Sequence, residues 1–356
     1  LNRNEVLRAL RVSGEAQGIS ALARVTELSR PTVDLAVRDL TERGLVLETV
    51  RNASSPRGGR PGREYRFDAR AGCLAAVTVT SHEIQVVLAD LRDQVVGEHR
   101  VRHADLNAEP DPPGCLRTAV DQALAAYDFP ADRLQVAVIG VRGIVDATGV
   151  IRTSGDLPSL VGPDAHRRLT EQFACPVLVE NDANLATLAE FRNLAGPADV
   201  VGLLIGEGIG CGLVLNGELY RGAHGAAGEF FGDDRDRPWV ATNARIRDHA
   251  KRRGRTFEAV FAAARDEAPA RELVVRYARD IAALVRELLV LDPPVIVVGG
   301  EIVAAGDVFL DAFREALAPV LYSDTKIIYS DLGADCLRVG ALQVAADWME
   351  RKLFQV

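Results

Sequence analysis

The apolar positions of residues 1–68 predict three short helices followed by a pair of strands. Apolar residues recur three and four positions apart in NEVLRAL. A second helical run, ALARVTEL, follows Ser20, whose hydroxyl we expect to cap that helix. Beyond Gly44, a residue type that often ends helices, the stretch LVLETV is typical of a β-strand.

The third helix is predicted to begin at Ser29, which can cap its N-terminus, with Pro31 in the first turn. One apolar stripe runs along it at positions i, i+4 and i+7, formed by Val33, Val37 and Leu40. Its other faces carry Arg30, Thr32, Asp34 and Arg38. In a helix-turn-helix the N-terminal part of the second helix of the motif enters the DNA major groove, so this helix is the candidate base-reading element.

The segment RNASSPRGGRPGREYRF places arginines among Gly, Pro and Ser after the first strand, as in the wing of a winged helix-turn-helix. A flexible loop of this kind can follow phosphates or reach into a minor groove. The predicted DNA-binding residues are Ser29, Arg30, Thr32 and Arg38 on the helix and Arg57, Arg60 and Arg63 in the wing. The alternative is a three-helix protein-interaction module followed by a solvated linker.

From residue 69 onward, strand-like runs alternate with helical segments in a pattern that occurs twice. Three strands are predicted in CLAAVTVTSHEIQVVLADLRDQVVGEHRV, and later strands in RLQVAVIG, ADVVGLLIGEGIGCGLVLNGELY and PPVIVVGG. Helices are predicted at 115–127, 164–173, 183–194, 243–253, 271–290, 307–318 and 340–353. Repeated β-β-β-then-α units predict a duplicated α/β fold with a cleft between its halves.

The charge balance changes along the chain and indicates two roles in one protein. The 356 residues carry a formal net charge of −8, yet residues 1–70 hold 13 Arg against 9 Asp or Glu. A basic front end on an acidic body favours DNA binding by the front end. Five scattered cysteines without a CxxC pair indicate a reduced, cytoplasmic protein, and no apolar run of about 18 residues predicts a membrane helix.

The stretch VENDAN places polar residues where a buried strand becomes a helix. Asn181 and Asp182 follow the strand-like residues 177–179, and a helical run of Ala and Leu comes after them. A carboxylate at such a junction is well placed to act as a general base.

Six motifs, in order, resemble those of the ROK family (repressors, open reading frames and sugar kinases): LSRPTV, GGRPG, VENDAN, GEGIGCGLVLNG, RGAHGAAGEF and VIVVGGE. The resemblance spans almost the whole chain. It implies an actin-like (ribonuclease-H-like) two-lobed α/β sugar-kinase fold behind an all-α winged helix-turn-helix. We expect a DNA-binding domain at 1–68, a small lobe at 69–180 on which residues 340–356 pack, and a large lobe at 181–339 that contributes the effector site and dimerisation.

In the kinase members of this family, the Asp of VENDAN accepts the proton of the attacking sugar hydroxyl, and two Gly-rich turns approach phosphate. The first turn resembles D-x-G-G-T-K, but here it is VTVTSHEI, with Thr78 in the Asp position. The second resembles G-T-G-x-G-x-G, but here Glu207 takes the Thr position. An anion there repels a polyphosphate. We therefore expect no kinase activity, no cofactor and only a vestigial base in Asp182.

The family's structural zinc site is also absent from the sequence. Relatives follow the Glu of GAAGEF with a Cys-rich segment that binds zinc together with a His. Here GEFFGDDRDRPWVATNARI contains no cysteine, and no His follows Glu229 until His249. We expect no bound metal.

A sugar site between the lobes is implied by the same resemblance. Its expected members are Asn181, Asp182, Glu229, Asp156 and His224. Asp156 belongs to SGDLPSL, which resembles a loop near the sugar that usually contains NLPGW. The alternative is a polar network inherited without a ligand.

The expected function is that of a transcriptional regulator, most simply a repressor, that binds a double-stranded DNA operator as a homodimer or homotetramer. A sugar or sugar-phosphate effector would change the spacing of two recognition helices. Two other functions stay open. One is an ATP-dependent sugar kinase with a DNA-binding appendage, and the other is a constitutive DNA-binding dimer whose kinase-like body holds no ligand.

Overall fold

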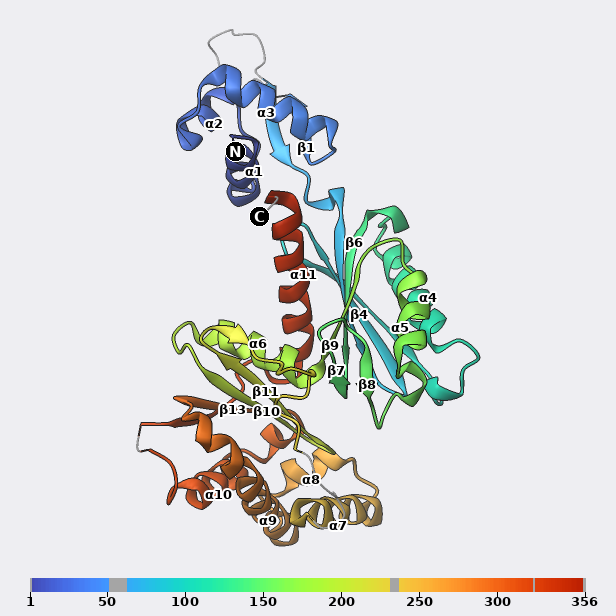
Figure 1. Cartoon of the computed structure of the whole chain (residues 1–356), viewed down its shortest axis with the longest axis vertical. Helices are drawn as coiled ribbons and strands as arrows, with labels where there is room; N and C mark the ends of the chain where they lie inside the picture. Colours follow the sequence, from blue (N-terminus) through green and yellow to red (C-terminus); the bar gives the residue numbers. More distant parts are fainter. Residues whose placement is uncertain (1, 51–62, 231–236, 323, 355–356) are drawn as a thin grey trace.

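The computed structural model describes residues 2–50, 63–230, 237–322 and 324–354. Figure 1 shows an elongated molecule in which an N-terminal unit, a first sheet and a second sheet follow one another along the longest axis. The C-terminal helix α11 (Cys336–Phe354) extends alongside these parts and ends next to α1. Among the described residues, every helix is too short or too polar to cross a lipid bilayer.

The N-terminal unit consists of helices α1 (Asn2–Ser13), α2 (Ile19–Thr26) and α3 (Arg30–Glu42) and the antiparallel strands β1 (Val46–Val50) and β2 (Arg63–Phe67). The predicted apolar stripe of α3 is buried in its core. Ser29 caps α3, since its Oγ accepts a hydrogen bond from the Thr32 N–H at 3.3 Å. The cap predicted for α2 is wrong. Gly18 has the extended backbone of a cap residue, so Ser20 lies inside the first turn.

The first sheet has the strand order β5-β4-β3-β6-β9. Its antiparallel strands are β3 (Cys73–Val79), β4 (Glu83–Asp90) and β5 (Val95–Arg102), and the parallel additions are β6 (Leu134–Val141) and β9 (Val177–Asn181). Helices α4 (Pro112–Ala126) and α5 (Pro163–Glu171) cover one face. The central strands β3 and β6 are buried almost throughout, which explains their unbroken apolar sequences. A short ribbon, β7 (Ile144–Val145) with β8 (Ile151–Thr153), follows β6.

The second sheet repeats this arrangement with the order β12-β11-β10-β13-β14. Three antiparallel strands, β10 (Val200–Ile205), β11 (Ile209–Leu215) and β12 (Glu218–Leu219), precede two parallel ones, β13 (Val295–Gly299) and β14 (Lys326–Tyr329). One face is covered by α7 (Pro238–Arg253), α8 (Phe257–Ala263), α9 (Ala268–Val285) and α10 (Asp307–Leu317). The repeated order confirms the predicted duplicated α/β fold.

Two helices connect the halves. Helix α6 (Asp182–Leu194) packs on β10 and β11 and against α11, which in turn packs on β3 and β6. The crossing of α6 and α11 is close because Gly340 has no side chain. A Cβ at that position would lie 2.0 Å from the Leu185 carbonyl oxygen.

The C-terminal end of α11 is joined to the N-terminal unit and the first sheet by one continuous apolar core. Asn4 donates a hydrogen bond to the Phe354 carbonyl oxygen at 2.8 Å. Arg11 pairs with Glu350 at 2.6 Å and with Asp93, in the turn after β4, at 2.7 Å. Through α11, the N-terminal unit is therefore in physical contact with the region around α6.

Several helix boundaries differ from the sequence prediction. Helix α7 begins at Pro238 rather than residue 243, because a proline is accommodated in a first turn. The helix predicted at 271–290 is α9, which starts earlier and gives way to a 3₁₀ segment at Arg286–Leu291. Helix α8 was not predicted, since seven residues give little periodic signal, although Thr256 caps it.

Candidate functional site

Segments from both sheets line a cleft of about 460 Å³, which we call the central cleft. This volume lies within the range of small-molecule binding sites. The charged side chains that line it are Arg142, Asp182, Glu207, Glu229 and Glu301. They come from the ends of β6 and β9, the β10–β11 turn, the loop after β12 and the segment after β13.

Asn181 and Asp182 lie where β9 meets α6, as predicted. The Asn181 side chain is used by the fold, since its Oδ1 accepts a hydrogen bond from the Asn184 N–H and its Nδ2 donates to the Gly143 carbonyl oxygen, both at 2.9 Å. Asn181 therefore caps α6. Fewer hydrogen-bonding positions of its side chain are left for a ligand than its place in VENDAN suggested. The expected lobe boundary at 180 and 181 falls inside β9.

Asp182 is only 8% exposed, and one of its oxygens has no hydrogen-bond partner among the described residues. Oδ1 accepts a hydrogen bond from the Ala183 N–H at 2.8 Å. Oδ2 lies 3.8 Å from Arg142 Nε, which is beyond hydrogen-bonding distance. Burial raises the pKa of Asp182, and the Arg142 charge opposes that rise. Because Asp182 lines the central cleft, its second oxygen is available to a ligand.

Glu229 enters the central cleft from the loop after β12. Gly228, directly before it, has a φ of 85°, and a Cβ there would lie 2.2 Å from the Cys211 carbonyl oxygen. Only glycine allows the loop to approach β11 this closely. Burial raises the pKa of Glu229, and the negative charge of Asp182 raises it further. The two carboxylates are therefore close enough to repel each other.

Sequence analysis did not identify the ion pair between Glu180 and Arg221. Glu180 is 6% exposed, and its Oε2 accepts a hydrogen bond from Arg221 Nε at 2.7 Å. Its Oε1 accepts one from the Asn184 side-chain amide at 2.9 Å. The pair fixes the loop after β12 against β9. Glu180 is a third polar residue at the end of an otherwise apolar strand. This feature of the sequence could have indicated the ion pair.

The turn between β3 and β4, residues 80–83, has all four of its backbone N–H groups bonded within the protein, at 2.9–3.3 Å. The acceptors are Thr80 Oγ1 for two of them, Asp156 Oδ2, and the Glu83 carbonyl oxygen. Backbone nests that bind phosphate hold their N–H groups free to point at the anion. This turn offers no such groups.

The turn between β10 and β11 carries an acidic side chain into the central cleft. Glu207 is exposed, and its carboxylate lies 3.8 Å from Arg247 Nε. The Glu301 carboxylate lies near the same turn, since both Glu207 and Glu301 line the cleft. Burial raises the pKa of Glu301, and the charge of Glu207 raises it further. This side of the cleft is therefore acidic as well.

Two of the five expected effector residues do not line the central cleft. Asp156 is occupied by Ser81, whose Oγ and N–H donate to its carboxylate at 2.7 and 3.2 Å. His224 is an exposed residue of the loop after β12. Of the five, Asn181, Asp182 and Glu229 lie in the lining, and the roles of Asp156 and His224 stay predictions. The sequence motifs alone did not predict how the loops that carry Asp156 and His224 run relative to the cleft.

The outer face of α3 is exposed. Arg30, at the first residue, is exposed, and so is Arg38, which pairs with Asp34 at 2.5 Å. Leu35 lies on the same face with 67% exposure and was not singled out from the sequence. An apolar side chain on a groove-reading helix can contact a thymine methyl group.

The remaining predicted DNA contacts differ in their surroundings. Ser29 Oγ and Thr32 Oγ1 lie 2.7 Å apart and close the first turn of α3. Arg63 is the first residue of β2 rather than part of the loop, and its Nε lies 3.2 Å from Glu48 Oε1. The other two predicted wing contacts lie outside the described residues, namely Arg57 and Arg60.

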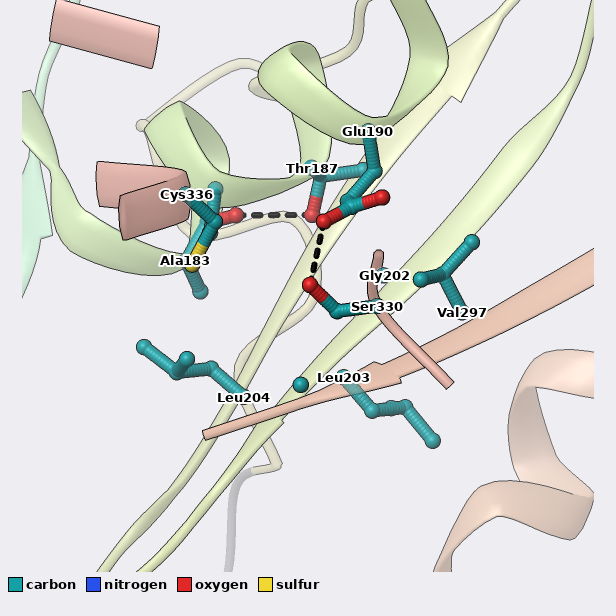
Figure 2. Close-up of a pocket in the computed structure, with 11 residues that line it drawn as sticks. Ala183, Thr187, Glu190, Gly202, Leu203, Leu204, Val297, Ser330 and Cys336 are labelled. Carbon is teal, nitrogen blue, oxygen red and sulfur yellow. Dashed lines mark hydrogen bonds between the residues drawn. The ribbon is translucent and has the colours of Figure 1, made fainter. Parts of the chain in front are cut away.

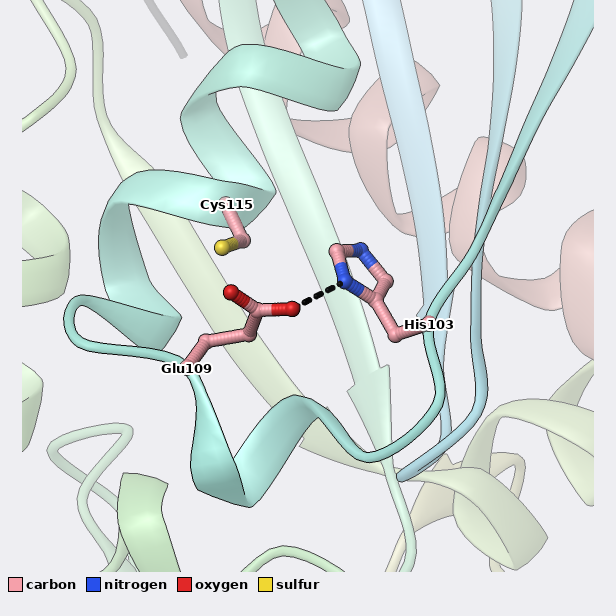
Figure 3. Close-up of side chains that lie close together, drawn as sticks. All are labelled: His103, Glu109 and Cys115. Carbon is pink, nitrogen blue, oxygen red and sulfur yellow. Dashed lines mark hydrogen bonds and ion pairs between the residues drawn. The ribbon is translucent and has the colours of Figure 1, made fainter.

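A group of metal-ligating side chains lies outside the central cleft, formed by His103, Glu109 and Cys115 (Figure 3). Their ligand atoms are within 4.8 Å of one another, and His103 Nδ1 lies 3.2 Å from Glu109 Oε1. Burial raises the pKa of the Cys115 thiol, with nearby carboxylates adding to the effect. Three ligands with a protonated thiol fall short of a closed tetrahedral zinc site. The expectation of no bound metal stays a prediction.

A second cavity, beneath α6, is too small for a ligand. It measures about 10 Å³, roughly the space of one water molecule. Figure 2 shows Ser330 donating a hydrogen bond to the Glu190 carboxylate at its edge. Burial raises the pKa of Glu190. We interpret this cavity as a packing feature between α6 and the second sheet.

The repeated sheets, the cleft between them and the strand-to-helix junction at Asp182 define a two-lobed actin-like fold of the sugar-kinase type. Residues 74–232 match the ROK family, so the chain carries a ROK family domain. The matched segment contains β3 to β12 and therefore most of the central cleft.

Solved structures agree with this fold. A ROK family transcriptional regulator, a homologue of the Escherichia coli MLC protein, superposes with a TM-score of 0.71 at 19% identity and covers 100% of this chain and 98% of that one. A ROK family glucokinase from Streptomyces griseus, in complex with glucose and AMPPNP, gives 0.63 at 22% identity, covering 78% of this chain and 100% of that one. The match to the regulator includes the N-terminal unit, which confirms that a helical N-terminal region precedes the two-lobed fold.

Sequence relatives include both enzymes and repressors. The bifunctional enzyme NanE/NanK of Brucella melitensis is 37% identical over 234 residues, which cover 61% of this chain and 44% of that protein. The xylose repressor of Bacillus subtilis is 27% identical over 210 residues, covering 58% of this chain and 54% of that protein. The alignments thus span about half the length of these curated relatives.

Proposed function

We propose that this protein is a transcriptional repressor that binds operator DNA through its N-terminal unit and responds to a sugar in the central cleft. The observation that carries the proposal is the exposed face of α3. Ser29 caps this helix, Arg30 and Arg38 point outward, and an Arg-rich connection joins the two strands that follow. A helix end of this kind fits a major groove.

Relatives support the same function. The xylose repressor of Bacillus subtilis is similar in sequence, and the ROK family transcriptional regulator is similar in fold over the whole chain. From these names we infer repression and a sugar as the effector. All five cysteines are unpaired, which agrees with action in the cytoplasm.

Helix α11 provides a physical connection between the two sites. It crosses α6, which begins at Asp182, with Gly340 against the Leu185 backbone. At its C-terminal end, α11 contacts α1. Glu350 pairs with Arg11, and the Phe354 carbonyl oxygen accepts a hydrogen bond from Asn4. A ligand that favours one position of α6 would therefore favour one position of the N-terminal unit. In a homodimer or homotetramer, this displacement changes whether two copies of α3 match half-sites about one helical turn apart.

An ATP-dependent sugar kinase is the main rival, because NanE/NanK and the glucokinase are similar to this chain. We propose that the chain is not an enzyme. The N–H groups of the turn at 80–83 are all bonded internally, and Glu207 and Glu301 make the other turn acidic. Phosphoryl transfer depends mainly on positioning and charge neutralisation, which these turns do not supply. Asp182 alone cannot replace them.

A constitutive DNA-binding dimer with a ligand-free body is the second rival. The side-chain bonds of Asn181 favour it, since the fold uses both ends of that amide. Asp182 Oδ2 opposes it, because this oxygen lines the central cleft, accepts no hydrogen bond from the described residues and can accept one from a ligand.

A thermal-shift screen of sugars, amino sugars and sugar phosphates tests the proposal. A ligand at 100 times its dissociation constant adds about 2.7 kcal/mol to the free energy of unfolding. The same ligand must then change the affinity of the protein for operator DNA. A ligand that stabilises the protein without any effect on DNA binding would separate the cleft from regulation and contradict the proposal.

A further inference from the structure

In the part of the chain that the structure describes, the central cleft is lined by four carboxylates and one guanidinium. Asp182, Glu207, Glu229 and Glu301 contribute the negative charges, and Arg142 is the single cationic side chain among the described lining residues. This arrangement lies inside a ligand-sized cavity rather than on an open surface, and it includes a carboxylate that is almost fully buried.

Among the described residues, the ion pairs formed by Asp182 and Glu207 are long. Arg142 stays 3.8 Å from Asp182, and Arg247 stays 3.8 Å from Glu207. The Arg142 side chain is 57% exposed, so solvent weakens its influence further. Asp182 Oδ2 therefore faces the cavity with the Arg142 guanidinium at 3.8 Å and no hydrogen bond from the described residues.

The acidic groups are arranged as two neighbouring pairs. Asp182 and Glu229 repel each other across one part of the cleft, and Glu207 and Glu301 repel each other at the β10–β11 turn. A ligand that donates hydrogen bonds relieves this repulsion, and one that carries a positive charge relieves it more.

The turn between β3 and β4, which lines a neighbouring cavity that shares Arg142 and Asp182 with the cleft, offers an anion no backbone donors. The N–H groups of residues 80–83 are bonded internally, as described above. In the other turn, the Gly206 N–H donates to the Gly208 carbonyl oxygen at 2.9 Å. A phosphate in the cleft would therefore face the carboxylates that line it.

We propose that the effector of the central cleft is an unphosphorylated sugar, and that a protonated amino sugar binds more tightly than the matched neutral sugar. This inference rests on the proposed function and narrows it. It removes sugar phosphates from the two effector classes that the sequence left open. Sugar hydroxyls satisfy Asp182 Oδ2, and an ammonium group lies against one of the two carboxylate pairs.

The test is isothermal titration of the full-length protein at pH 6.5 with matched ligands. Each series contains a hexose, its 2-amino-2-deoxy form and its 6-phosphate, in the gluco, manno and galacto configurations. We expect the amino sugar of the preferred series to bind at least tenfold more tightly than the neutral sugar, and the 6-phosphate to bind at least tenfold more weakly.

Charge-neutral variants identify the carboxylate that causes the tighter binding of the amino sugar. Glu229→Gln and Glu301→Gln each remove one carboxylate, and the variant that faces the amine should reduce the amino-sugar advantage several-fold while changing neutral-sugar binding much less. Asp164→Asn is the matched control, because Asp164 is 96% exposed on α5 and lies outside the cleft. It should leave the advantage unchanged.

The possible outcomes separate this inference from the proposed function. If the 6-phosphate binds as tightly as the neutral sugar, or the amino sugar has no advantage, the inference is overturned while a sugar-responsive repressor stands. If no member of any series binds, both the proposed sugar site and the inferred preference for amino sugars are contradicted. Equal loss of the advantage in Asp164→Asn would show that overall charge, not the cleft, creates the preference.

Discussion

The central cleft and the N-terminal unit are connected through α11 and differ in charge. Among the described lining residues of the cleft, four carboxylates face one guanidinium, whereas residues 1–70 hold 13 Arg against 9 Asp or Glu. The net charge of −8 describes neither region. Local charge therefore decides what each region binds. The cleft suits hydrogen-bond donors and cations, and the basic excess of the N-terminal unit suits the anionic surface of DNA.

The largest expected effect concerns catalysis, because an active phosphate site would invalidate the acidic description of the cleft. We expect no ATP-dependent phosphorylation of any hexose or amino sugar in a coupled assay. Kinases typically turn over at about 1–100 per second, so activity in that range is readily detected. Such activity would show that Glu207 and the closed turn at 80–83 do not prevent phosphate binding.

Asp182→Asn should remove most of the stabilisation by a sugar ligand, about 2.7 kcal/mol at 100 times the dissociation constant. The substitution keeps an oxygen that can accept from the Ala183 N–H, so the fold should survive. DNA affinity without effector should stay close to that of the unmodified protein. Thermal-shift and DNA-binding assays check both parts, with Asp164→Asn as the surface control. A full ligand response in Asp182→Asn would exclude this carboxylate from the site.

Arg11→Ala tests the connection between the two regions. Its side chain is 16% exposed and bridges α1 to Glu350 and Asp93, so its loss should cost roughly 1–2 kcal/mol. Hydrogen exchange in α1 to α3 should become faster, and the effect of the ligand on DNA binding should weaken while sugar binding itself stays intact. Arg351→Ala, an exposed position on α11, is the matched control. If the ligand changes DNA binding to the same extent in Arg11→Ala as in the unmodified protein, α11 does not connect the cleft to the N-terminal unit.

The smallest expected effect concerns metal. The purified protein should contain no stoichiometric zinc by elemental analysis, because the Cys-rich segment of the family is missing and His103, Glu109 and Cys115 offer only three ligands. About one zinc per chain that disappears in Cys115→Ser would place a metal at this group. Zinc that persists in Cys115→Ser would point to another part of the chain.

Much of the fold was predictable from the sequence because its signals are local. The Ser29 cap, the apolar stripe of α3 and the buried strands β3 and β6 follow from periodicity and capping alone. Ser20 failed as a cap because the extended backbone occurs at Gly18, two residues earlier. Only a local backbone angle distinguishes these positions.

The site was less predictable because its geometry depends on contacts between distant residues. VENDAN marked the strand-to-helix junction at Asp182, but the partner of Glu180 is Arg221, 41 positions away. Asp156 was expected near the ligand and instead binds Ser81, 75 positions away. No spacing along the chain reveals such pairings, since they arise from how loops cross between the sheets.

The measurement that tests the central claim most directly is a salt titration of DNA binding by fluorescence anisotropy. Operator sequences are first selected from random duplexes with the full-length protein. The unmodified protein, Arg30→Ala and Arg60→Ala are then compared on the selected duplex and on a random one.

If α3 reads the operator, Arg30→Ala loses about 1–3 kcal/mol on the selected duplex and much less on the random one. Arg60→Ala, in the Arg-rich wing sequence, weakens both and reduces the salt dependence by roughly one unit of slope. If Arg30→Ala shifts both duplexes equally, α3 is not the base-reading element. If neither variant changes binding, the N-terminal unit is a protein-interaction module and the account of this chain as a DNA-binding repressor is contradicted.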